Sequence, residues 1–156
     1  MKQSTAWALV GSQFGLLAGL IVLPSGDLWS RGAVAGAISI TAVALGIAIG
    51  VAGGLGLGAT LTPLPIPKDD GELVTNGVYH FVRHPIYSGL LLATAGIVVW
   101  GASLGHLIGW VALWGVLMAK SVLEEKMLHE RYPEYQNYAS ITGRLVPKFR
   151  RQGRGG

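Results

Sequence analysis

Three long stretches without a charged side chain constrain this chain more than any other feature of its sequence. No Asp, Glu, Lys or Arg occurs in residues 3–26, 32–67 or 84–119, which are 24, 36 and 36 residues long. A helix of ~20 mostly apolar residues crosses the hydrocarbon core of a bilayer. The first stretch therefore accommodates one membrane span, and each of the others accommodates one long or two short spans. The pattern predicts an integral membrane protein.

The composition agrees with this interpretation and excludes several other classes. Charged residues make up 13% of the 156 residues, against roughly 25% in typical soluble domains, and apolar residues make up 51%. An ordinary soluble domain, a disordered tail and a basic nucleic-acid-binding domain are therefore excluded, and no nucleic-acid partner is expected. The chain has no cysteine, so disulfides, thiolate catalysis and cysteine-ligated zinc are excluded as well.

Glycines and prolines divide the uncharged stretches into four predicted transmembrane helices. The first covers about 6–23, and a retained helix is favoured over a cleaved signal peptide because the apolar run is long. The second covers about 33–55, before a glycine-rich stretch and three prolines. A single helix through the third stretch would be ~54 Å long. The glycines at 101–105 therefore predict a tight hairpin between spans 85–100 and 104–123.

We expect one all-α membrane domain over residues 1–156, whose parts differ in character. Residues 1–61 carry two glycine-striped transmembrane helices, and 62–84 form a cytoplasmic loop. The helical hairpin covers 85–123, and a cytoplasmic, amphipathic C-terminal segment covers 124–156.

The distribution of basic residues predicts the orientation. Four spans place both termini on the same side of the membrane. In this arrangement 11 of the 12 Lys and Arg residues lie on that side, and only Arg31 lies on the other. The positive-inside rule then predicts a multi-pass protein with both termini in the cytoplasm.

Glycines recur every four residues on one face of each of the first two spans: Gly11, Gly15 and Gly19 in the first, and Gly46, Gly50, Gly54 and Gly58 in the second. Stripes of small residues let helix backbones approach closely within lipid. They predict that the first span packs against the second, with a homodimer through the stripes as the second option.

Polar groups at membrane depth are costly and therefore informative. They gather in residues 77–89 and 124–138, which should face each other at the cytoplasmic mouth. Pro85 suits the first turn of a helix, which puts His84 at the cap position and Arg83 just outside it. With the unpaired N–H groups of the helix start, these two side chains form a candidate seat for an anion. The alternative is that both merely reach toward lipid headgroups.

The adjacent acids Glu124 and Glu125 project about 100° apart on a helix. One can face the bundle while the other faces water or Arg83. A carboxylate in this place could hold an ammonium, a hydroxyl or a sulfonium. The alternative is a solvated helix end with an ordinary Glu125–His129 pair.

Two further patterns carry little weight. His80 and His84 are four residues apart, but no third ligand is evident, so no metal site is predicted. The alternating glycines at 54–58 end a membrane helix and have no βαβ unit around them, so no nucleotide-binding turn is predicted.

The polar clusters resemble the isoprenylcysteine carboxyl methyltransferase family and the related membrane phospholipid methyltransferases. The shared pattern is Gly77-x-Tyr79-x-x-x-Arg83-His84-Pro85-x-Tyr87-x-Gly89, then Glu124-Glu125, Tyr135-x-x-Tyr138 and Arg144-Leu145-Val146-Pro147. The order and spacing match over residues 71–149, whereas the first two spans carry no motif.

The resemblance implies an S-adenosylmethionine-dependent methyltransferase embedded in the membrane. Its cofactor would lie at the cytoplasmic mouth, and a lipophilic or prenylated acceptor would enter from the surrounding membrane lipid. By motif, the residues implied to bind the cofactor are His84, Tyr87 and Gly89, with Glu125 and Tyr135 as additions. Arg83 and Glu124 would lie nearest the acceptor and the transferring methyl group.

The chemistry of the acceptor stays open. A carboxylate acceptor needs no general base, and Arg83 could orient it through a two-pronged contact. An amine or thiol acceptor would have to lose a proton, which Glu124 could take.

Two other functions are also compatible with the sequence. Membrane sterol reductases, which use NADPH, resemble the chain around Arg83-His84-Pro85 and the C-terminal tyrosines, but they are much longer and lack the Glu-Glu pair. A non-catalytic scaffold assembled through the glycine stripes is the other alternative. It predicts no ligand at the cytoplasmic mouth and no loss of function on changing His84 or Glu124.

Overall fold

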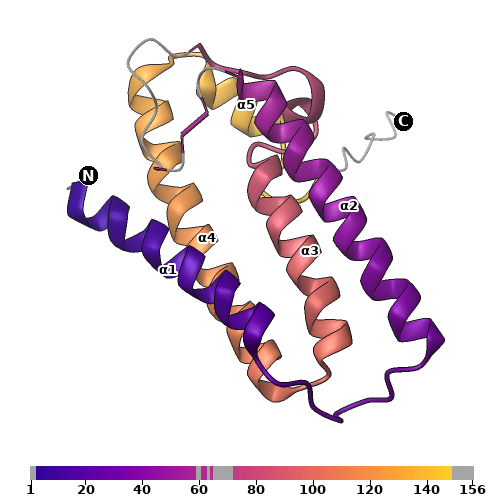
Figure 1. Ribbon diagram of the computed structural model, residues 1–156. Helices are drawn as coiled ribbons and strands as arrows, with labels where there is room; N and C mark the ends of the chain where they lie inside the picture. The colour runs from indigo at the N-terminus through magenta and orange to yellow at the C-terminus, as the bar shows by residue number, and fades with distance from the viewer. Residues whose placement is uncertain (1–2, 59–60, 63, 65–71, 149–156) are drawn as a thin grey trace, which may run out of the picture.

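The computed structural model describes residues 3–58, 61–62, 64 and 72–148, and its described part is a bundle of helices (Figure 1). The elements follow one another as α1 (Gln3–Val22), α2 (Ala33–Leu57), the short 3-10 helix η2 (Gly77–His80), α3 (Pro85–Gly101), α4 (Leu104–Arg131) and α5 (Tyr135–Ile141). No strand occurs within these described residues, so the predicted all-α class is confirmed.

Three of the helices, α1, α2 and α4, are long and apolar enough to cross a membrane. The helix α3 is equally apolar but has 17 residues. Large apolar side chains on α2, such as Ile40 and Leu55, are exposed on the surface of the bundle. Exposed apolar surface on long uncharged helices is the pattern of a protein embedded in lipid. The exposed apolar surface supports the membrane class. Because α3 is shorter than the three candidate spans, a fourth span stays a prediction.

The part of the α2 glycine stripe at Gly46 and Gly50 packs against α3, not against α1. A Cβ atom added at Gly89 of α3 would lie 2.5 Å from the carbonyl oxygen of Gly46 and 2.6 Å from the amide nitrogen of Gly50. The Ser39 hydroxyl also donates a hydrogen bond of 2.7 Å to the carbonyl of Gly96. Small residues on both helices thus allow the backbones to touch.

The helix α1 packs mainly against α4, and the prediction that the first two spans pack together is wrong. Leu20 of α1 joins the buried cluster formed by Leu91, Leu113 and Leu117 of α3 and α4. The stripe on α1 faces open space, because a Cβ atom at Gly15 would meet nothing within 4 Å. A homodimer through that stripe stays a prediction.

The predicted hairpin between α3 and α4 is present, and its turn has only two residues. Ala102 adopts a left-handed conformation with φ of 46°, which ends α3. Ser103 caps α4, and its hydroxyl accepts a hydrogen bond from the His106 amide. The tight turn places α3 and α4 antiparallel and side by side (Figure 1).

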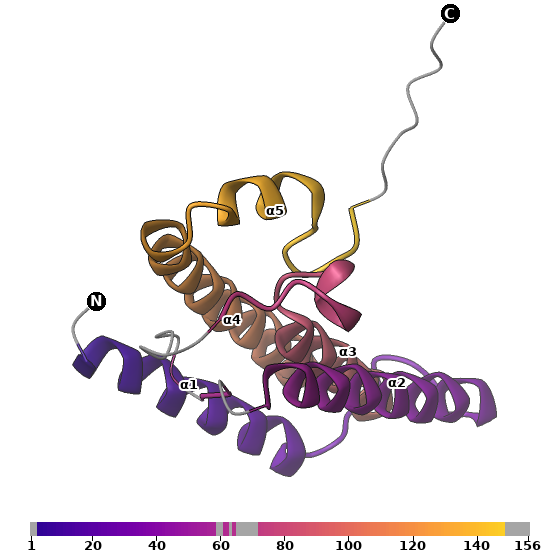
Figure 2. The same ribbon diagram turned by 90° about the horizontal axis from the view of Figure 1, so that it is seen from above.

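The start of α3, the end of α4 and the C-terminal segment meet at one end of the bundle. The amide of Arg83 donates to the Gly143 carbonyl (2.8 Å), and the amide of His84 donates to the Arg144 carbonyl (3.1 Å). Figure 2 shows this yellow C-terminal segment beside the residues that precede α3. Side chains of the first polar cluster also bond to the second, Arg83 to Glu125 and Tyr87 to Glu124, so the two polar clusters face each other, as the sequence predicts.

Candidate active site

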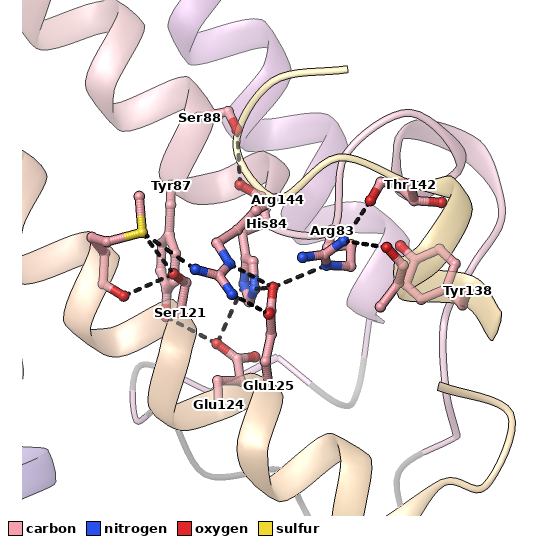
Figure 3. A network of polar contacts seen from close by, with 12 residues as sticks. Arg83, His84, Tyr87, Ser88, Ser121, Glu124, Glu125, Tyr138, Thr142 and Arg144 are labelled. Atoms are coloured by element: carbon pink, nitrogen blue, oxygen red, sulfur yellow. Dashed lines mark hydrogen bonds and ion pairs between the residues drawn. The ribbon is translucent and has the colours of Figure 1, made fainter. Parts of the chain in front are cut away.

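The carboxylate of Glu125, only 8% exposed, is the centre of a polar network at this end of the bundle (Figure 3). Its Oε1 atom lies 2.9 Å from Arg83 Nε and 3.1 Å from His84 Nε2. Arg144 donates to both oxygens, at 3.0 Å from Nε and 2.7 Å from Nη2. One acidic side chain of α4 thus joins α4, the start of α3 and the C-terminal segment. Because a buried carboxylate is costly unless it is paired, these partners hold one another in place.

The two side chains of the predicted anion seat, Arg83 and His84, both contact a carboxylate of the chain itself, that of Glu125. His84 is the residue before the first turn of α3, and Pro85 occupies that first turn. The guanidinium of Arg83 contacts Glu125 and also donates to the backbone carbonyls of Ala139 and Thr142. Arg83 therefore ties the start of α3 to α5 and α4 at once.

Glu124 points in a different direction from Glu125. It accepts a hydrogen bond of 3.2 Å from the Tyr87 hydroxyl, and its Oε2 atom lies 3.6 Å from His84 Nδ1. The rings of His84 and Tyr87 are stacked, with centroids 5.4 Å apart. Glu124 lines the cavity beside this network, whereas Glu125 does not. The divergence of the two acids on the helix therefore gives them different surroundings.

The cavity has a volume of about 360 Å³ and opens among α1, α2, α3, α4 and α5. Its walls are mostly apolar, and all five tyrosines of the chain line it: Tyr79, Tyr87, Tyr132, Tyr135 and Tyr138. Charged side chains reach it at a few places: Glu72, Arg83, Lys120 and Glu124. An apolar pocket with a few convergent polar groups is typical of a small-molecule site.

The hydroxyl of Tyr135 has no hydrogen-bond partner within the described part of the chain, although it is fully buried. A buried polar group normally finds a partner, so this unpaired hydroxyl is an exception among the described residues. The neighbouring Tyr138 differs, because its hydroxyl donates a bond of 2.6 Å to the carbonyl of Tyr79.

Three tyrosine hydroxyls outside the candidate spans, those of Tyr79, Tyr135 and Tyr138, stay protonated over the physiological range. Burial raises the pKa of Tyr138 to about 12, partly offset by the positive charge of Arg83. Burial likewise raises the pKa of Tyr79 and of Tyr135 well above the ordinary range. These groups therefore act as hydrogen-bond donors and acceptors at neutral pH, not as bases.

The structure brings most of the predicted site residues to the cavity wall: Arg83, His84, Tyr87, Glu124 and Tyr135. Gly89 lies elsewhere, at the contact between α3 and α2, where its missing side chain makes room for the α2 backbone. Glu125 lies behind the wall and contacts the residues that form it.

Sequence reasoning missed two residues that line the deeper part of the cavity, Lys120 and Gln13. Lys120 is buried inside α4 and donates a hydrogen bond of 2.5 Å to the Gln13 side-chain oxygen. Their positions in the sequence could have indicated this, because burying a lysine or a glutamine within an apolar helix is energetically unfavourable and such side chains seldom face lipid. Arg144 belongs to the sequence motif, but the motif does not predict its contact with Glu125.

Comparisons with known proteins find matches over the part of the chain that carries most of these residues. The family model described as phospholipid methyltransferase matches residues 34–135, which is more than half of the chain. A methanethiol S-methyltransferase from Pseudomonas deceptionensis is 36% identical over 86 residues, covering 53% of this chain and 31% of that protein. An uncharacterised protein from Schizosaccharomyces pombe is 29% identical over 79 residues, covering 47% of this chain and 23% of its own length. The matched part is thus less than a third of either relative.

Proposed function

The chain belongs to the phospholipid methyltransferase family, and we propose that it is an S-adenosylmethionine-dependent methyltransferase that acts on a lipophilic acceptor at the cytoplasmic face of the membrane. The cavity carries this proposal, because every tyrosine of the chain and Glu124 line a single space where the motif residues meet. The relative that methylates methanethiol, by its name, supports methyl transfer as the reaction class. Reduction by NADPH has no such support.

The residues of the cavity fit the proposed cofactor. When bound, S-adenosylmethionine supplies a methyl group carried on a positively charged sulfonium. Tyrosine faces attract cations, and the Glu124 carboxylate adds a negative charge beside Tyr87. Tyr135 lines the same space, and its buried hydroxyl has no hydrogen-bond partner among the described residues.

We assign the cavity-wall residues His84, Tyr87 and Tyr135 to cofactor binding, and Arg83 and Glu124 to the neighbourhood of the acceptor and of the methyl group carried on the sulfonium. Positioning supplies most of the catalysis in a direct displacement. Glu125 contributes by holding Arg83 and His84 in their places. Gly89 contributes by letting α3 approach α2 closely, which sets where Tyr87 lies.

We also propose that α3 is the fourth span and that both termini lie in the cytoplasm. With ~1.5 Å per residue, a helix of 17 residues is ~25 Å long, close to the ~30 Å of a hydrocarbon core. Since the chain has no cysteine, single cysteines can report the topology. In intact cells, an impermeant maleimide should label Ser25→Cys and spare Ser140→Cys. The opposite labelling would reverse the orientation.

The function is tested by titrating S-adenosylmethionine into the protein in lipid nanodiscs, with NADPH in parallel. Saturable binding is expected, and Glu124→Gln should weaken it about 10-fold because a charge-assisted contact is lost. Glu130→Gln, which changes an exposed acid of the same helix, is the matched control. Binding of NADPH instead, or of neither compound, would contradict the proposal.

A further inference from the structure

An apolar patch is exposed at the polar end of the bundle, where the C-terminal segment meets the start of α3. It consists of Phe81, Ile141 and Val146, whose exposed fractions are 60%, 51% and 72%. Each lies within three residues of one end of the backbone contact in which the Arg83 amide donates to the Gly143 carbonyl. Single exposed apolar side chains are ordinary, but several of them gathered beside charged residues point to an interaction surface.

The contacts of the C-terminal segment place this patch at a defined depth. The His84 amide donates to the Arg144 carbonyl at 3.1 Å, and the Ser88 hydroxyl donates to the Leu145 carbonyl at 2.7 Å. The segment therefore lies level with the first turn of α3, which begins at Pro85. In the topology proposed above, this turn lies where the hydrocarbon core meets the cytoplasmic headgroups. The apolar patch thus lies at the level of the headgroups and not in open cytoplasm.

The C-terminal segment also lies to one side of the bundle. Figure 2 shows α5 and the residues after it on the side of α3 and α4 that faces away from α1 and α2. Lipid surrounds the outer side of a membrane-embedded bundle, so the headgroup layer extends along this segment. Segments in such a place bind the membrane through apolar side chains and basic residues together.

The same segment is basic throughout. Residues 135–156 include five Lys and Arg residues and no Asp or Glu, although the chain has eight acids in all. Lys148 is exposed, and its ammonium donates a hydrogen bond of 2.8 Å to the carbonyl of Ser140, the residue before Ile141. An ammonium has three N–H donors, so this bond leaves room for a further partner. The exposed acids nearest in sequence, Glu130 and Glu134, precede α5.

We propose that the apolar patch and Lys148 bind anionic phospholipids of the protein's own membrane. The apolar side chains enter the boundary between headgroups and acyl chains, and the ammonium binds a phosphate oxygen. A soluble protein partner fits less well, because the patch lies level with the headgroups. The inference rests on the span proposed for α3 and does not depend on methyl transfer.

Docking of this segment also fixes one wall of the cavity. Tyr135 and Tyr138 of α5 line the cavity. Arg144 pairs with Glu125, which in turn holds Arg83 in the cavity wall. Lipid bound beside these residues steadies the wall, so the affinity for S-adenosylmethionine depends on the anionic lipid content of the membrane. This consequence, unlike the docking itself, also rests on the proposed function.

A fluorophore on the apolar patch tests the docking directly. Since the chain has no cysteine, Val146→Cys takes a single label. The full chain is placed in nanodiscs of phosphatidylcholine, with increasing phosphatidylglycerol, that contain a lipid with a quencher near its headgroup. We expect quenching of the label that increases with phosphatidylglycerol and falls at high salt. Equal quenching in neutral and anionic nanodiscs would overturn the binding of anionic lipid.

Matched variants separate the charge from the position of the label. Lys148→Gln should lower the apparent affinity for phosphatidylglycerol about 5-fold, whereas Lys126→Gln, an exposed lysine of α4, should leave it unchanged. Ile141→Cys should reproduce the result of Val146→Cys. A label at Gln136→Cys, an exposed position about 140° away from Ile141 around α5, should be quenched weakly. Quenching at residue 136 equal to that at 146 would contradict docking through the patch.

Cofactor titration tests the link between docking and the cavity. Ile141→Ser combined with Val146→Ser removes two exposed apolar side chains, neither of which lines the cavity. In nanodiscs with phosphatidylglycerol, this variant should bind S-adenosylmethionine more weakly than the wild type, and in neutral nanodiscs the difference should shrink. Equal affinity of the two proteins in both nanodiscs would contradict the link. Failure of the wild type to bind the cofactor in either nanodisc would instead contradict the proposed function, and the quenching measurement would still decide the docking.

Discussion

Arg144 and Glu125 form a two-pronged ion pair, with Nη2 lying 2.7 Å from Oε2 and Nε lying 3.0 Å from Oε1. The pair fastens the C-terminal segment to α4. Arg83 and His84 contact the same carboxylate from the start of α3. The residues that line the cavity therefore depend on a contact between two residues that do not line it.

Replacing Glu125 should destabilise the protein substantially. Glu125→Ala leaves Arg83 without its buried partner, a change that typically costs about 3 kcal/mol of the free energy of unfolding. We expect a clear fall in the midpoint of thermal unfolding in detergent. Glu130→Ala, at an exposed position of α4, serves as the control. An unchanged midpoint for Glu125→Ala would show that the network is not structural.

Cofactor binding should depend on the guanidinium geometry of Arg144 and not only on its positive charge. Arg144→Lys keeps the charge but loses the two parallel contacts with Glu125, so it should behave more like Arg144→Ala than like the wild type. The measured quantity is the affinity for S-adenosylmethionine, which should fall about 10-fold in both variants. Full affinity in Arg144→Lys would mean that charge alone suffices.

Gly89 should tolerate no side chain. A Cβ atom in Gly89→Ala would collide with the α2 backbone at Gly46 and Gly50, and overpacking of this kind costs about 1–3 kcal/mol. The midpoint of thermal unfolding should fall. Gly50→Ala is the matched control, because a Cβ atom there meets nothing within 4 Å. Equal midpoints for the two variants would refute the packing role.

Removing the Tyr135 hydroxyl should affect the ligand and not the fold. Because this buried hydroxyl has no partner within the described residues, Tyr135→Phe should leave the free energy of unfolding unchanged or raise it. Affinity for S-adenosylmethionine should fall about 10-fold. Tyr138→Phe removes a hydroxyl that is already bonded to Tyr79 and should instead lower stability. Equal cofactor affinity in Tyr135→Phe and the wild type would remove Tyr135 from the binding site.

Stability should fall at alkaline pH, and Tyr138 should contribute to the fall. The pKa of Tyr138 rises from 10.0 to about 12 on burial, so the folded state keeps a proton that the unfolded state loses above pH 10. Its contribution is therefore complete below pH 10 and is lost as the pH rises toward about 12, by up to ~1.4 kcal/mol for each pH unit. Thermal unfolding across this range should show a smaller alkaline loss in Tyr138→Phe. An identical loss in both proteins would contradict the assignment.

Several features could be predicted from the sequence because they depend on local rules. Pro85 sets the start of α3 with His84 as its cap, and the small residues around Ala102 set the hairpin turn. These local features are sufficient to predict that Arg83 and Glu124 lie at the same end of the bundle.

Other features depend on contacts that no local pattern encodes. Which of Glu124 and Glu125 faces the cavity depends on the rotation of α4, which is set by its packing against α1 and α3. The partner of α1 depends on a long-range contact between Gln13 and Lys120. The glycine stripes predicted close packing but not its partner, since a smooth face accepts any neighbour of matching shape.

The central claim is methyl transfer at the cavity lined by Glu124, and labelled methyl transfer tests it most directly. Protein in nanodiscs is given methyl-labelled S-adenosylmethionine and alkyl acceptors with carboxylate, thiol and amine heads, and label is counted in the lipid-soluble products. We predict label in at least one product with the wild type and with Glu130→Gln, and a loss of about 10-fold or more with Glu124→Gln, because the negative charge beside the sulfonium is lost. Labelled product formed equally by Glu124→Gln, or by none of the proteins, would contradict the account.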